Sequence, residues 1–346
     1  MTHSTTAIVG WDIGGVNTKA VRLEPGGSGR ATPRTLFAPL RMEHDAAALA
    51  PTLRRLAAAL GEGAVTHAVT MTAELSQAFR TKREGVAFVL DALEAAFPGQ
   101  PVRVYSVDGR FLDPGEARAR PLDVAAANWA ATARFVGRTE PDCLLVDIGT
   151  TSTDIVPVVA AEPSPVGRTD PERLLAGELV YTGALRTPVE AVARVVPLWG
   201  GHCPLAAEAF ALMGDVYLWL GALEGADYSV RPPDGRPATR EFAGERLARA
   251  VCADAEMLDE EAVGAIARAL AEAQVESVLA GMRRVLARHP DIGRAVVTGL
   301  GAFIAAEAAR RTDLEVVPLA DRIGGAARMA PAAAVAWLLA ESAVGA

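Results

Sequence analysis

The sequence predicts an α/β fold made of two α/β halves, with a mostly helical insertion in the second half. Two similar stretches give the first indication. TAIVGWDIGGVNTKAVRL at 6–23 and DCLLVDIGTTSTDIVPVV at 142–159 both place Asp-Ile-Gly and a small polar cluster between two apolar runs. β-rich runs alternate with helical patterns after each stretch, whereas residues 188–288 are mostly helical in pattern. Each half therefore begins with a hairpin whose turn carries Asp-x-Gly.

We place the first half at residues 1–125 and the second at 126–346, with the helical insertion at about 185–290 and a C-terminal docking helix. A chain of 346 residues is long enough for two domains of ordinary size. With 51% apolar and 22% charged residues, it has the balance of a globular protein with a sizeable core.

The first half begins with a strand, a tight turn and a second strand over residues 6–24, because TAIVGW and TKAVRLE are rich in β-formers and DIGGVN has turn chemistry. Apolar residues at helical spacing predict a helix at 84–97, which Pro98-Gly99 closes. The other expected elements are a helix at 45–60, strands at 65–71 and 102–107, and a helix at 121–137 that links the halves.

The second half repeats the opening hairpin and then departs from the pattern of the first. Strands at 143–147 and 153–159 flank the turn 148–152. The later elements are a short strand at 178–183, helices at 188–196, 203–221, 238–252 and 259–289, a loop at 224–237, a strand at 294–299, a helix at 302–311, a strand at 314–319 and the final helix.

Composition argues against several classes of partner. A net charge of −8 without a clustered basic face argues against nucleic-acid binding. The spacing of Cys143, Cys203 and Cys252 fits neither a disulfide framework nor a CxxC metal site, so we expect a cytoplasmic protein. MTHSTTAIVG lacks the features of a signal peptide, and the apolar tail APAAAVAWLLAESAVGA is too short to span a bilayer.

The two turns have the chemistry of phosphate-binding loops. Glycine allows unusual backbone angles and close approach, and a nest of N–H groups binds anions. Threonine and serine hydroxyls add further donors. The phosphate-binding candidates are Gly14, Gly15, Asn17, Thr18 and Lys19 in the first turn, and Gly149, Thr150, Thr151, Ser152 and Thr153 in the second. One such turn is most often only a hairpin, but two copies, each opening a half, favour a functional interpretation.

Carboxylates accompany both turns. Asp12 and Asp147 end the preceding strands, and an aspartate there can hold Mg²⁺ or accept a proton from a nucleophile. Asp154 follows the second turn. A third turn in VVTGLGAF opens a helix with Gly299 and Gly301, which suits either phosphate approach or tight strand–helix packing.

Other polar residues near predicted strand ends are weaker candidates for substrate binding. Each has a structural alternative of similar weight, such as a solvated helix start or ordinary packing. These candidates are Arg80, Lys82, Asp108, Thr182 and Gly183. Met213, Tyr217 and Trp219 could line a pocket for an aromatic substrate, although a stripe at this spacing is more often packing.

The motifs DIGGVNTK, DIGTTSTD and TGLGA, in this order, resemble the actin/Hsp70/sugar-kinase superfamily. MTAELSQAFRTKREGV at 71–86 and GELVYTGALRTPVEAV at 177–192 resemble its hydantoinase/oxoprolinase A branch. Over nearly the whole chain, WDIGGVNTKAV, SQAFRTKREGV, DIGTTSTDIVP, YTGALRTPV and GHCPLAAEAFALMGDVYLWLG are similar to the tetrahydromethanopterin-linked C1-transfer pathway proteins, whose archaeal members make the furan–phenol ether of methanofuran.

The resemblance implies two ribonuclease-H-like halves and a specific reaction. An aminomethyl-furanmethyl diphosphate would be joined to the phenol oxygen of γ-glutamyltyramine, with release of diphosphate. Asp12, Asp147 and Asp154 would then be the catalytic candidates, with Mg²⁺ on Asp12 and Asp147 and the base left open between Asp154 and Asp12. The exact phenolic acceptor and the oligomeric state stay open, and a homo-oligomer is compatible with the sequence.

The sequence also leaves room for other activities. The turn Gly299-Leu300-Gly301 lacks the double-glycine pattern common in ATP-binding members, so ATP is possible but not favoured. The alternatives are an ATP-dependent small-molecule kinase, a hydantoinase/oxoprolinase-like hydrolase, and a non-catalytic actin-like nucleotide sensor.

Overall fold

Both Asp-Ile-Gly stretches fold as β-hairpins, as the sequence predicts. The computed structural model describes residues 6–24 and 33–342. The first hairpin consists of β1 (Ala7–Ile13) and β2 (Asn17–Leu23), and the second of β7 (Cys143–Ile148) and β8 (Thr153–Val159). The expectations for the N-terminal stretch and for the apolar tail fall partly on residues 1–5 and 343–346, which lie outside the described residues.

The first hairpin belongs to a mixed sheet with the strand order β3-β2-β1-β4-β5-β6. β1 reads AIVGWDI, pairs antiparallel with β2 and parallel with β4, and is buried along its whole length. The other strands are β3 (Arg34–Pro39), β4 (Val65–Met71), β5 (Val102–Tyr105) and β6 (Phe111–Leu112). β3 and β6 are not predicted from the sequence, because β6 has two residues and β3 has only one buried residue.

The second hairpin belongs to a sheet with the order β10-β8-β7-β13-β14, and β9 pairs with β8. β7 runs parallel to β13, so that Asp147 is level with Thr298. The remaining strands are β9 (Glu162–Pro163), β10 (Leu179–Val180), β13 (Arg294–Thr298) and β14 (Glu315–Pro318). Strand, turn and helix return after the insertion, as predicted.

The chain divides into two compact units, each with its own core. The first unit comprises Met1–Cys143, Val156–Glu172 and Pro318–Ala346, and the second comprises Leu144–Ile155 and Arg173–Val317. The C-terminal helix α14 (Ala330–Ser342) therefore belongs with the first unit, whereas the sequence analysis placed it in the second half.

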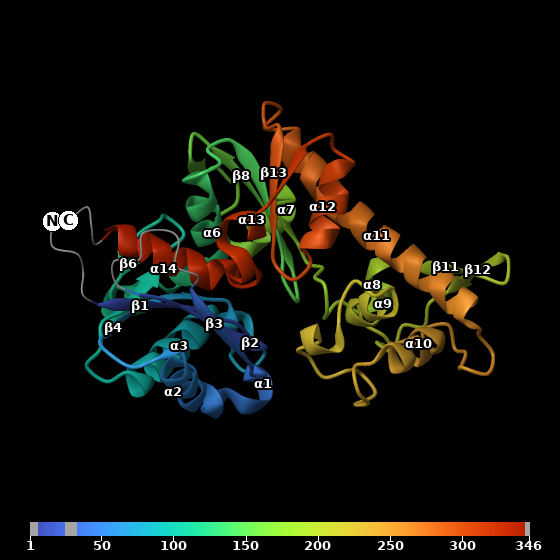
Figure 1. The fold of residues 1–346 in the computed structure, drawn as a ribbon, viewed down its shortest axis with the longest axis horizontal. Coiled ribbons are helices and arrows are strands. Elements are labelled where there is room, and N and C mark those ends of the chain that lie inside the picture. The colour runs from blue at the N-terminus through green and yellow to red at the C-terminus, as the bar shows by residue number, and fades with distance from the viewer. Residues whose placement is uncertain (1–5, 25–32, 343–346) are drawn as a thin grey trace. The chain divides into compact units, whose positions relative to one another are not determined.

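In the first unit, α14 covers one face of the first sheet and α2 and α3 cover the other (Figure 1). Thr81 caps α3 by accepting a hydrogen bond from the Glu84 amide, which explains why this helix begins where it does. The helices of this unit are α1 (Met42–Asp45), α2 (Leu49–Leu60), α3 (Lys82–Ala96), α4 (Pro114–Ala119), α5 (Pro121–Val124), α6 (Asn128–Gly137) and α13 (Ala320–Ile323); α7 (Asp170–Ala176) crosses into the second unit.

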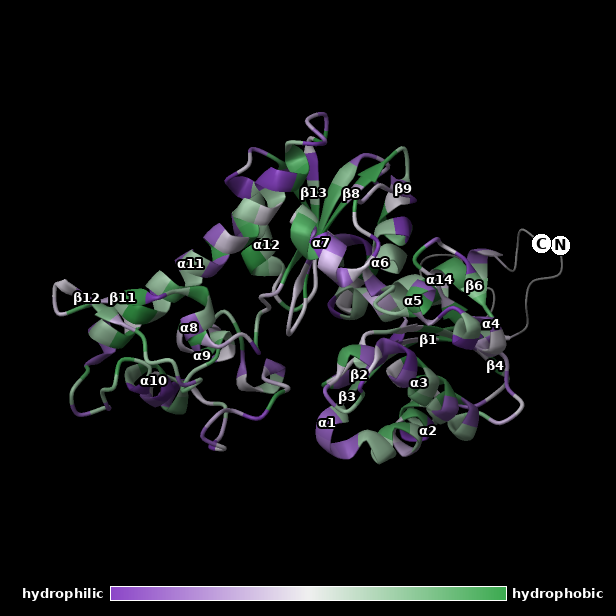
Figure 2. Cartoon of the chain, turned by 180° about the vertical axis from the view of Figure 1, so that it is seen from behind, coloured by the Kyte–Doolittle hydropathy of each residue, from purple (hydrophilic) through white to green (hydrophobic). Residues whose placement is uncertain are grey.

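The second unit is organised along α11 (Glu260–Leu286), a helix of 27 residues. Asp259 caps its first turn, which also carries Glu260 and Glu261, so the negative charges lie at the positive end of the helix dipole. Hydrophilic and hydrophobic residues alternate along α11 (Figure 2), as expected when only one side is buried. The other helices of this unit are α8 (Val189–Val192), α9 (Met213–Trp219), α10 (Arg240–Arg249) and α12 (Ala302–Arg310).

The insertion is less helical at its start than the sequence predicts. The expected helices at 188–196 and 203–221 are replaced by the short α8, a hairpin of β11 (Val195–Leu198) and β12 (Gly201–Pro204), and the seven-residue α9. Trp199 and Gly200 form the hairpin turn with φ values of 50° and 77°. Positive φ at both turn residues matches the strand twist, so this turn overrides the helical pattern of the flanking residues.

The sequence analysis expects the apolar tail to be too short to span a bilayer, but together with the residues before it the stretch Ala320–Ser342 is long and apolar enough by length and composition alone. Of its most apolar window, 56% is buried inside the protein. Its helix α14 packs on β1, β2 and β4. This is the environment of a core helix and agrees with the docking role expected from the sequence.

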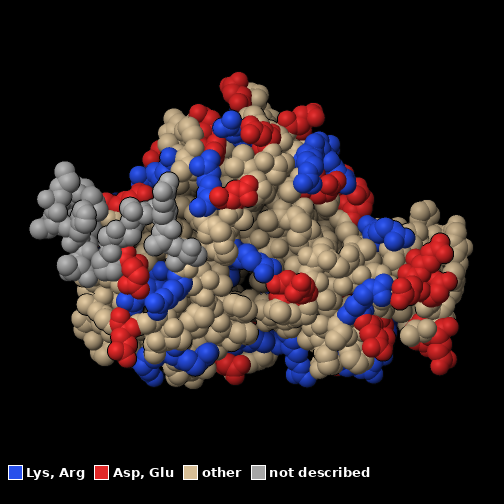
Figure 3. All heavy atoms as spheres, viewed as in Figure 1, with Lys and Arg blue, Asp and Glu red and all other residues tan. Residues whose placement is uncertain are grey.

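Charged side chains of both signs are interspersed over the face of the molecule shown in Figure 3. Arg311, for example, contacts Glu272, Glu276 and Glu307. Exposed pairs of this kind contribute little stability individually.

Gly10 sets how closely α14 approaches β1. A Cβ at this position would collide with the carbonyl oxygen of Ala332 and would lie 2.8 Å from the Ala336 Cβ. We predict that Gly10→Ala lowers the free energy of unfolding by about 2–3 kcal/mol, because the helix must move off the strand. Urea denaturation measures this. Gly325→Ala is the matched control, since a Cβ at Gly325 has no neighbour within 4 Å; an equal loss in both variants would contradict the packing argument.

Candidate functional site

The turn of the first hairpin is held from behind by the backbone that follows β3. The Gly14 amide donates to the Asn17 carbonyl at 2.9 Å. The carbonyls of Gly15 and Val16 accept hydrogen bonds from the amides of Met42 and Leu40, both at 2.9 Å. Because C=O and the next N–H of a trans peptide point in opposite directions, the amides of Val16 and Asn17 face away from that segment. The turn thus presents donors in one direction, as an anion-binding loop requires.

Asp12 lies beside this turn and is paired with Lys19. The two residues are opposite each other in the β1–β2 ladder, and Lys19 Nζ lies 3.1 Å from Asp12 Oδ2. Asp12 is 6% exposed, and its other oxygen, Oδ1, is buried and accepts no hydrogen bond from the described residues. The side chains of Asn17 and Thr18 are also buried, so the backbone of this turn is better placed than their side chains to meet a ligand.

A buried acidic residue that the sequence analysis did not single out lies at the same edge of the sheet. Glu74 is 1% exposed and sits in the 3-10 helix Ala73–Leu75, just after β4. The parallel pairing of β1 and β4 places Ile13 level with Met71. Gly85 lets α3 close over Glu74, because a Cβ at Gly85 would lie 2.5 Å from the Glu74 Cα. The signal that could have found Glu74 is a lone acid in an otherwise apolar post-strand segment, MTAEL.

Lys82 connects Glu74 to a second carboxylate. Its Nζ lies 2.5 Å from Asp170 Oδ2 and 3.7 Å from Glu74 Oε1, and its side chain is 22% exposed. Burial raises the pKa of Glu74 to about 7, although the charge of Lys82 acts in the opposite direction. Lys82, a predicted substrate-binding residue, is therefore held between two carboxylates, one of which changes charge near neutral pH.

Two other candidates of the first unit lie on its surface. The backbone amide of Arg80 donates to the Glu84 carboxylate at 2.9 Å, and its side chain is exposed. Asp108 accepts hydrogen bonds from Ser106 and Arg110. Burial alone would raise the pKa of Asp108, but these hydrogen bonds outweigh it and hold the pKa below its ordinary value.

The second hairpin turn is held in the same manner as the first. The Gly149 amide donates to the Ser152 carbonyl at 3.0 Å. The Ala184 amide donates to the Gly149 carbonyl at 2.9 Å, and the Arg186 amide donates to the Thr150 carbonyl at 2.9 Å. By the same peptide geometry, the amides of Thr150 and Thr151 face away from this segment. Both hairpins thus have two successive turn carbonyls fixed from behind.

The predicted residues Thr182 and Gly183 belong to the segment that fixes the second turn. A Cβ at Gly183 would lie 2.5 Å from the Thr151 nitrogen and 2.6 Å from the Thr150 carbonyl carbon. The hydroxyl of Thr153 donates to the Thr182 carbonyl at 2.7 Å and is fully buried. In this structure Thr153, Thr182 and Gly183 therefore support the turn from within the second unit.

The third turn packs directly on the second hairpin. The Gly301 amide donates to the Ile148 carbonyl at 2.8 Å. Gly299 has φ of 86°, and a Cβ there would collide with the Ile148 carbonyl and with Asp147 Oδ1. These glycines therefore serve close packing of the third turn against β7, which is one of the two interpretations that the sequence allows.

Asp154 is engaged in a buried ion pair. Arg173 Nη1 lies 2.7 Å from Asp154 Oδ1, and the same guanidinium donates to the Glu178 carbonyl at 2.9 Å. Arg173 is 1% exposed and Asp154 is 7% exposed. The pair ties α7 to β8, a structural role that leaves this carboxylate less available for proton transfer than Asp12.

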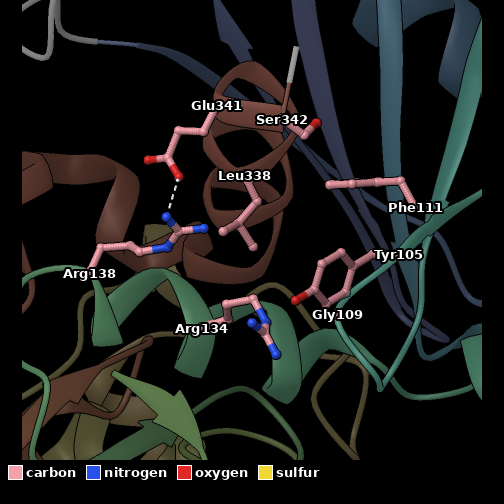
Figure 4. A pocket seen from close by; sticks show the side chains of 8 residues that line it. All are labelled: Tyr105, Gly109, Phe111, Arg134, Arg138, Leu338, Glu341 and Ser342. Carbon is pink, nitrogen blue, oxygen red and sulfur yellow. Dashed lines mark ion pairs between the residues drawn. The ribbon is translucent and has the colours of Figure 1, made fainter. Parts of the chain in front are cut away.

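A hollow of about 220 Å³ lies elsewhere in the first unit, between β5, α6 and α14 (Figure 4). Arg138 pairs with Glu341 at 3.2 Å, and Arg134 pairs with Glu162 at 2.6 Å. Burial raises the pKa of Tyr105, which also lines the hollow, to about 12. None of the residues predicted as site residues lines this hollow.

No group of three or more His, Cys, Asp or Glu side chains suited to a metal ion occurs within residues 6–24 and 33–342. The buried Oδ1 of Asp12 nevertheless fits a hard cation, because carboxylate oxygens are ligands that Mg²⁺ accepts one or two at a time alongside water and phosphate.

Comparison with known proteins adds three findings. The profile of the hydantoinase/oxoprolinase family matches residues 65–342. The (4-{4-[2-(gamma-L-glutamylamino)ethyl]phenoxymethyl}furan-2-yl)methanamine synthase of Methanocaldococcus jannaschii is 35% identical over 334 residues, which are 96% of this chain and 97% of the synthase. The enzyme of the same name from Methanococcus vannielii is 30% identical over 197 residues, 56% of this chain and 88% of that one.

Among solved structures, a nucleotide-free acetone carboxylase aligns with a TM-score of 0.58 and 12% identity, covering 97% of this chain and 70% of that chain. At this identity the likeness concerns the fold alone. It confirms the predicted fold class, an actin-like α/β architecture with two ribonuclease-H-like halves.

The raised pKa of Glu74 predicts a pH-dependent stability. Between its ordinary pKa of 4.5 and about 7, the folded protein binds a proton at Glu74 that the unfolded chain has released. Stability therefore falls as the pH rises through this window. In Glu74→Gln this loss should disappear, so the free energy of unfolding of the variant should gain about 3 kcal/mol on the wild type between pH 4.5 and pH 8.

Urea titrations at several pH values test this prediction. Leu75→Gln is the control, because it changes an exposed neighbour in the same 3-10 helix without removing a titrating group. Parallel stability curves for Glu74→Gln and the wild type would show that Glu74 ionises as an ordinary carboxylate.

Proposed function

We propose that this chain forms the ether bond between a furanmethyl group and a phenol. It belongs to the hydantoinase/oxoprolinase family and, within it, to the family of the phenoxymethylfuran methanamine synthases. The observation that carries the proposal is the similarity to the Methanocaldococcus enzyme over almost the full length of both chains. The substrates would be small molecules, an aminomethyl-furanmethyl diphosphate and a glutamyl-tyramine-type phenol.

The proposed reaction is a substitution at the furanmethyl carbon. The bond between that carbon and the bridging oxygen of diphosphate breaks, and its electron pair leaves with diphosphate. The phenol oxygen forms the new bond to the same carbon, and the phenol proton passes to a base. The electron-rich furan stabilises positive charge on the carbon, so bond breaking can run ahead of bond making.

The enzyme's main task is then to stabilise negative charge as it develops on diphosphate. Preorganised N–H donors in a site that excludes water are effective at this. Each unit supplies such donors, the amide of Val16 in the first and those of Thr150 and Thr151 in the second. Lys19, in the strand that follows the first turn, and Lys82, at the start of α3, both already contact carboxylates.

For the proton of the phenol we favour Asp12 over Asp154. A phenol has an ordinary pKa of about 10, so a base in contact with it is needed near neutral pH. Asp154 is committed to Arg173, whereas Oδ1 of Asp12 accepts no hydrogen bond within residues 6–24 and 33–342.

Mg²⁺ is proposed as a cofactor. With Asp12 serving as the base, Asp147 is the predicted metal ligand that would hold the ion, because Oδ1 of Asp12 cannot bind it and accept the phenol proton at the same time. When bound, it would supply positive charge to the diphosphate oxygens. ATP is not required by the proposed reaction. The third turn, whose Gly301 amide is already bonded to Ile148, offers little support for nucleotide binding. A cytoplasmic location is consistent with this small-molecule chemistry.

Purified protein should release diphosphate from a furanmethyl diphosphate only when the phenolic acceptor is present. Ether and diphosphate should appear in equal amounts, and added ATP should not be consumed. Chromatographic quantification of both products with an ATP assay in parallel measures this. ATP hydrolysis without any reaction of the furan compound would favour the kinase or hydrolase alternatives.

Asp12 and Asp154 should respond differently to removal of their charge. Asp12→Asn should lower kcat by roughly 10²–10⁴-fold, the usual contribution of a general base, and should also lower stability, because Lys19 loses its carboxylate partner. Asp154→Asn should lower the free energy of unfolding by about 3–5 kcal/mol, because the buried Arg173 would lose the charge of the carboxylate that it contacts at 2.7 Å. The folded fraction of Asp154→Asn should keep most of its kcat. Normal turnover in Asp12→Asn would remove Asp12 as the base.

A further inference from the structure

A fully buried amide side chain, Gln274, lies in the middle of α11. Its Nε2 donates to Thr182 Oγ1 at 2.6 Å and to the Gly183 carbonyl at 2.9 Å, and its Oε1 accepts from the Tyr217 hydroxyl at 2.5 Å. Both donors and the acceptor of the amide are therefore used. A buried polar group that is completely satisfied in this way holds its neighbours in one arrangement.

The orientation of the amide follows from its partners. A backbone carbonyl can only accept, so the atom facing Gly183 must be the nitrogen. The oxygen then faces Tyr217, which must donate to it. Thr182 Oγ1 accepts from Gln274 and in turn donates to Thr187 Oγ1 at 3.3 Å. We call Tyr217, Gln274 and Thr182 the brace.

The brace acts on the segment that fixes the second hairpin turn. Thr182 accepts from Thr153 through its carbonyl, and Gly183 lies against the backbone of Thr150 and Thr151. The following amide, Ala184, donates to the Gly149 carbonyl. A change in the side chain at Gln274 would therefore reach the amides of Thr150 and Thr151 through Gly183, which contacts both Gln274 and the turn.

The brace also reaches the third turn. The ring of Tyr217 packs edge-on against Phe303 of α12, with ring centroids 4.8 Å apart. α12 begins immediately after Gly301, the residue that is bonded to Ile148 at the end of β7. Tyr217 is 3% exposed and joins α9, α11 and α12.

We propose that Gln274 is a positioning residue for diphosphate: through Thr182 and Gly183 it fixes the direction in which the second hairpin turn presents its amides. This inference rests on the proposed function, because diphosphate is the anion that this turn would bind. Fixed donors stabilise developing charge without reorganising during the reaction, whereas a turn that fluctuates loses part of that stabilisation.

The test compares Gln274→Met with Tyr228→Phe. Methionine keeps the length of the side chain but makes none of the three hydrogen bonds. Tyr228 is the matched control, since it is a buried tyrosine of the same insertion whose hydroxyl donates to Asp215 at 3.1 Å and which lies outside the brace. Gln274→Met loses three buried hydrogen bonds and Tyr228→Phe loses one, so both should unfold at a lower temperature than the wild type.

Only Gln274→Met should weaken the binding of diphosphate and the reaction of the furanmethyl diphosphate. Its kcat/KM for the furanmethyl diphosphate should fall by about tenfold or more, and the inhibition constant of inorganic diphosphate should rise by a similar factor, when assayed well below the unfolding temperature. Tyr228→Phe should change both by less than about twofold. Equal kinetic losses in the two variants, or a normal inhibition constant in Gln274→Met, would overturn the proposal.

A direct readout separates this proposal from the proposed function. Amide hydrogen exchange of peptides covering 149–153 and 182–187 should be faster in Gln274→Met than in the wild type and unchanged in Tyr228→Phe. If this exchange pattern is seen but the wild type makes no ether, the proposed function is wrong. Gln274 would then still order the second hairpin turn, and the anion bound there would be a different one. Unchanged exchange in Gln274→Met would refute the brace itself.

Discussion

The arrangement of the candidate site depends on one backbone constraint: in each hairpin turn, two successive carbonyls are hydrogen-bonded from behind. In the first turn the donors are the amides of Met42 and Leu40, and in the second they include the amides of Ala184 and Arg186. A trans peptide that uses its carbonyl on one side must present its N–H on the other. The Asp-x-Gly turns therefore acquire their direction from segments far away in the sequence.

The surroundings of the hairpin turn differ between the two units. In the first, Gly10 and Gly85 allow α14 and α3 to approach so closely that β1 is buried and Glu74 is enclosed next to Lys82. In the second, a chain of hydrogen bonds runs from Tyr217 through Gln274 to Thr182. Both turns are flanked by ion pairs, Asp12 with Lys19 and Asp154 with Arg173, and the second is also supported by the buried amide of Gln274.

The sequence predicts the two hairpins, the return of the α/β pattern after the insertion, and the fold class, because these depend on apolar periodicity and turn residues close to one another in the chain. The β11–β12 hairpin escapes prediction because the helical spacing of the flanking residues outweighs the turn signal of Gly200-Gly201, beside which Trp199 adopts a positive φ. Glu74 and Gln274 escape it because a single polar residue in a helix or short turn looks solvated until tertiary packing buries it. The ion pair of Asp154 with Arg173 likewise joins segments whose contact the sequence does not reveal.

In the proposed reaction the diphosphate is a leaving group attached to the substrate, and no separate nucleotide takes part. The most informative measurement uses a furanmethyl diphosphate with ¹⁸O at the oxygen that joins the furanmethyl carbon to phosphorus. Mass spectrometry then locates the label in the two products. If the carbon–oxygen bond breaks as proposed, all the label leaves with diphosphate and the ether oxygen comes from the phenol. Label retained in the furan product would mean that a phosphorus–oxygen bond breaks instead, and it would contradict the account.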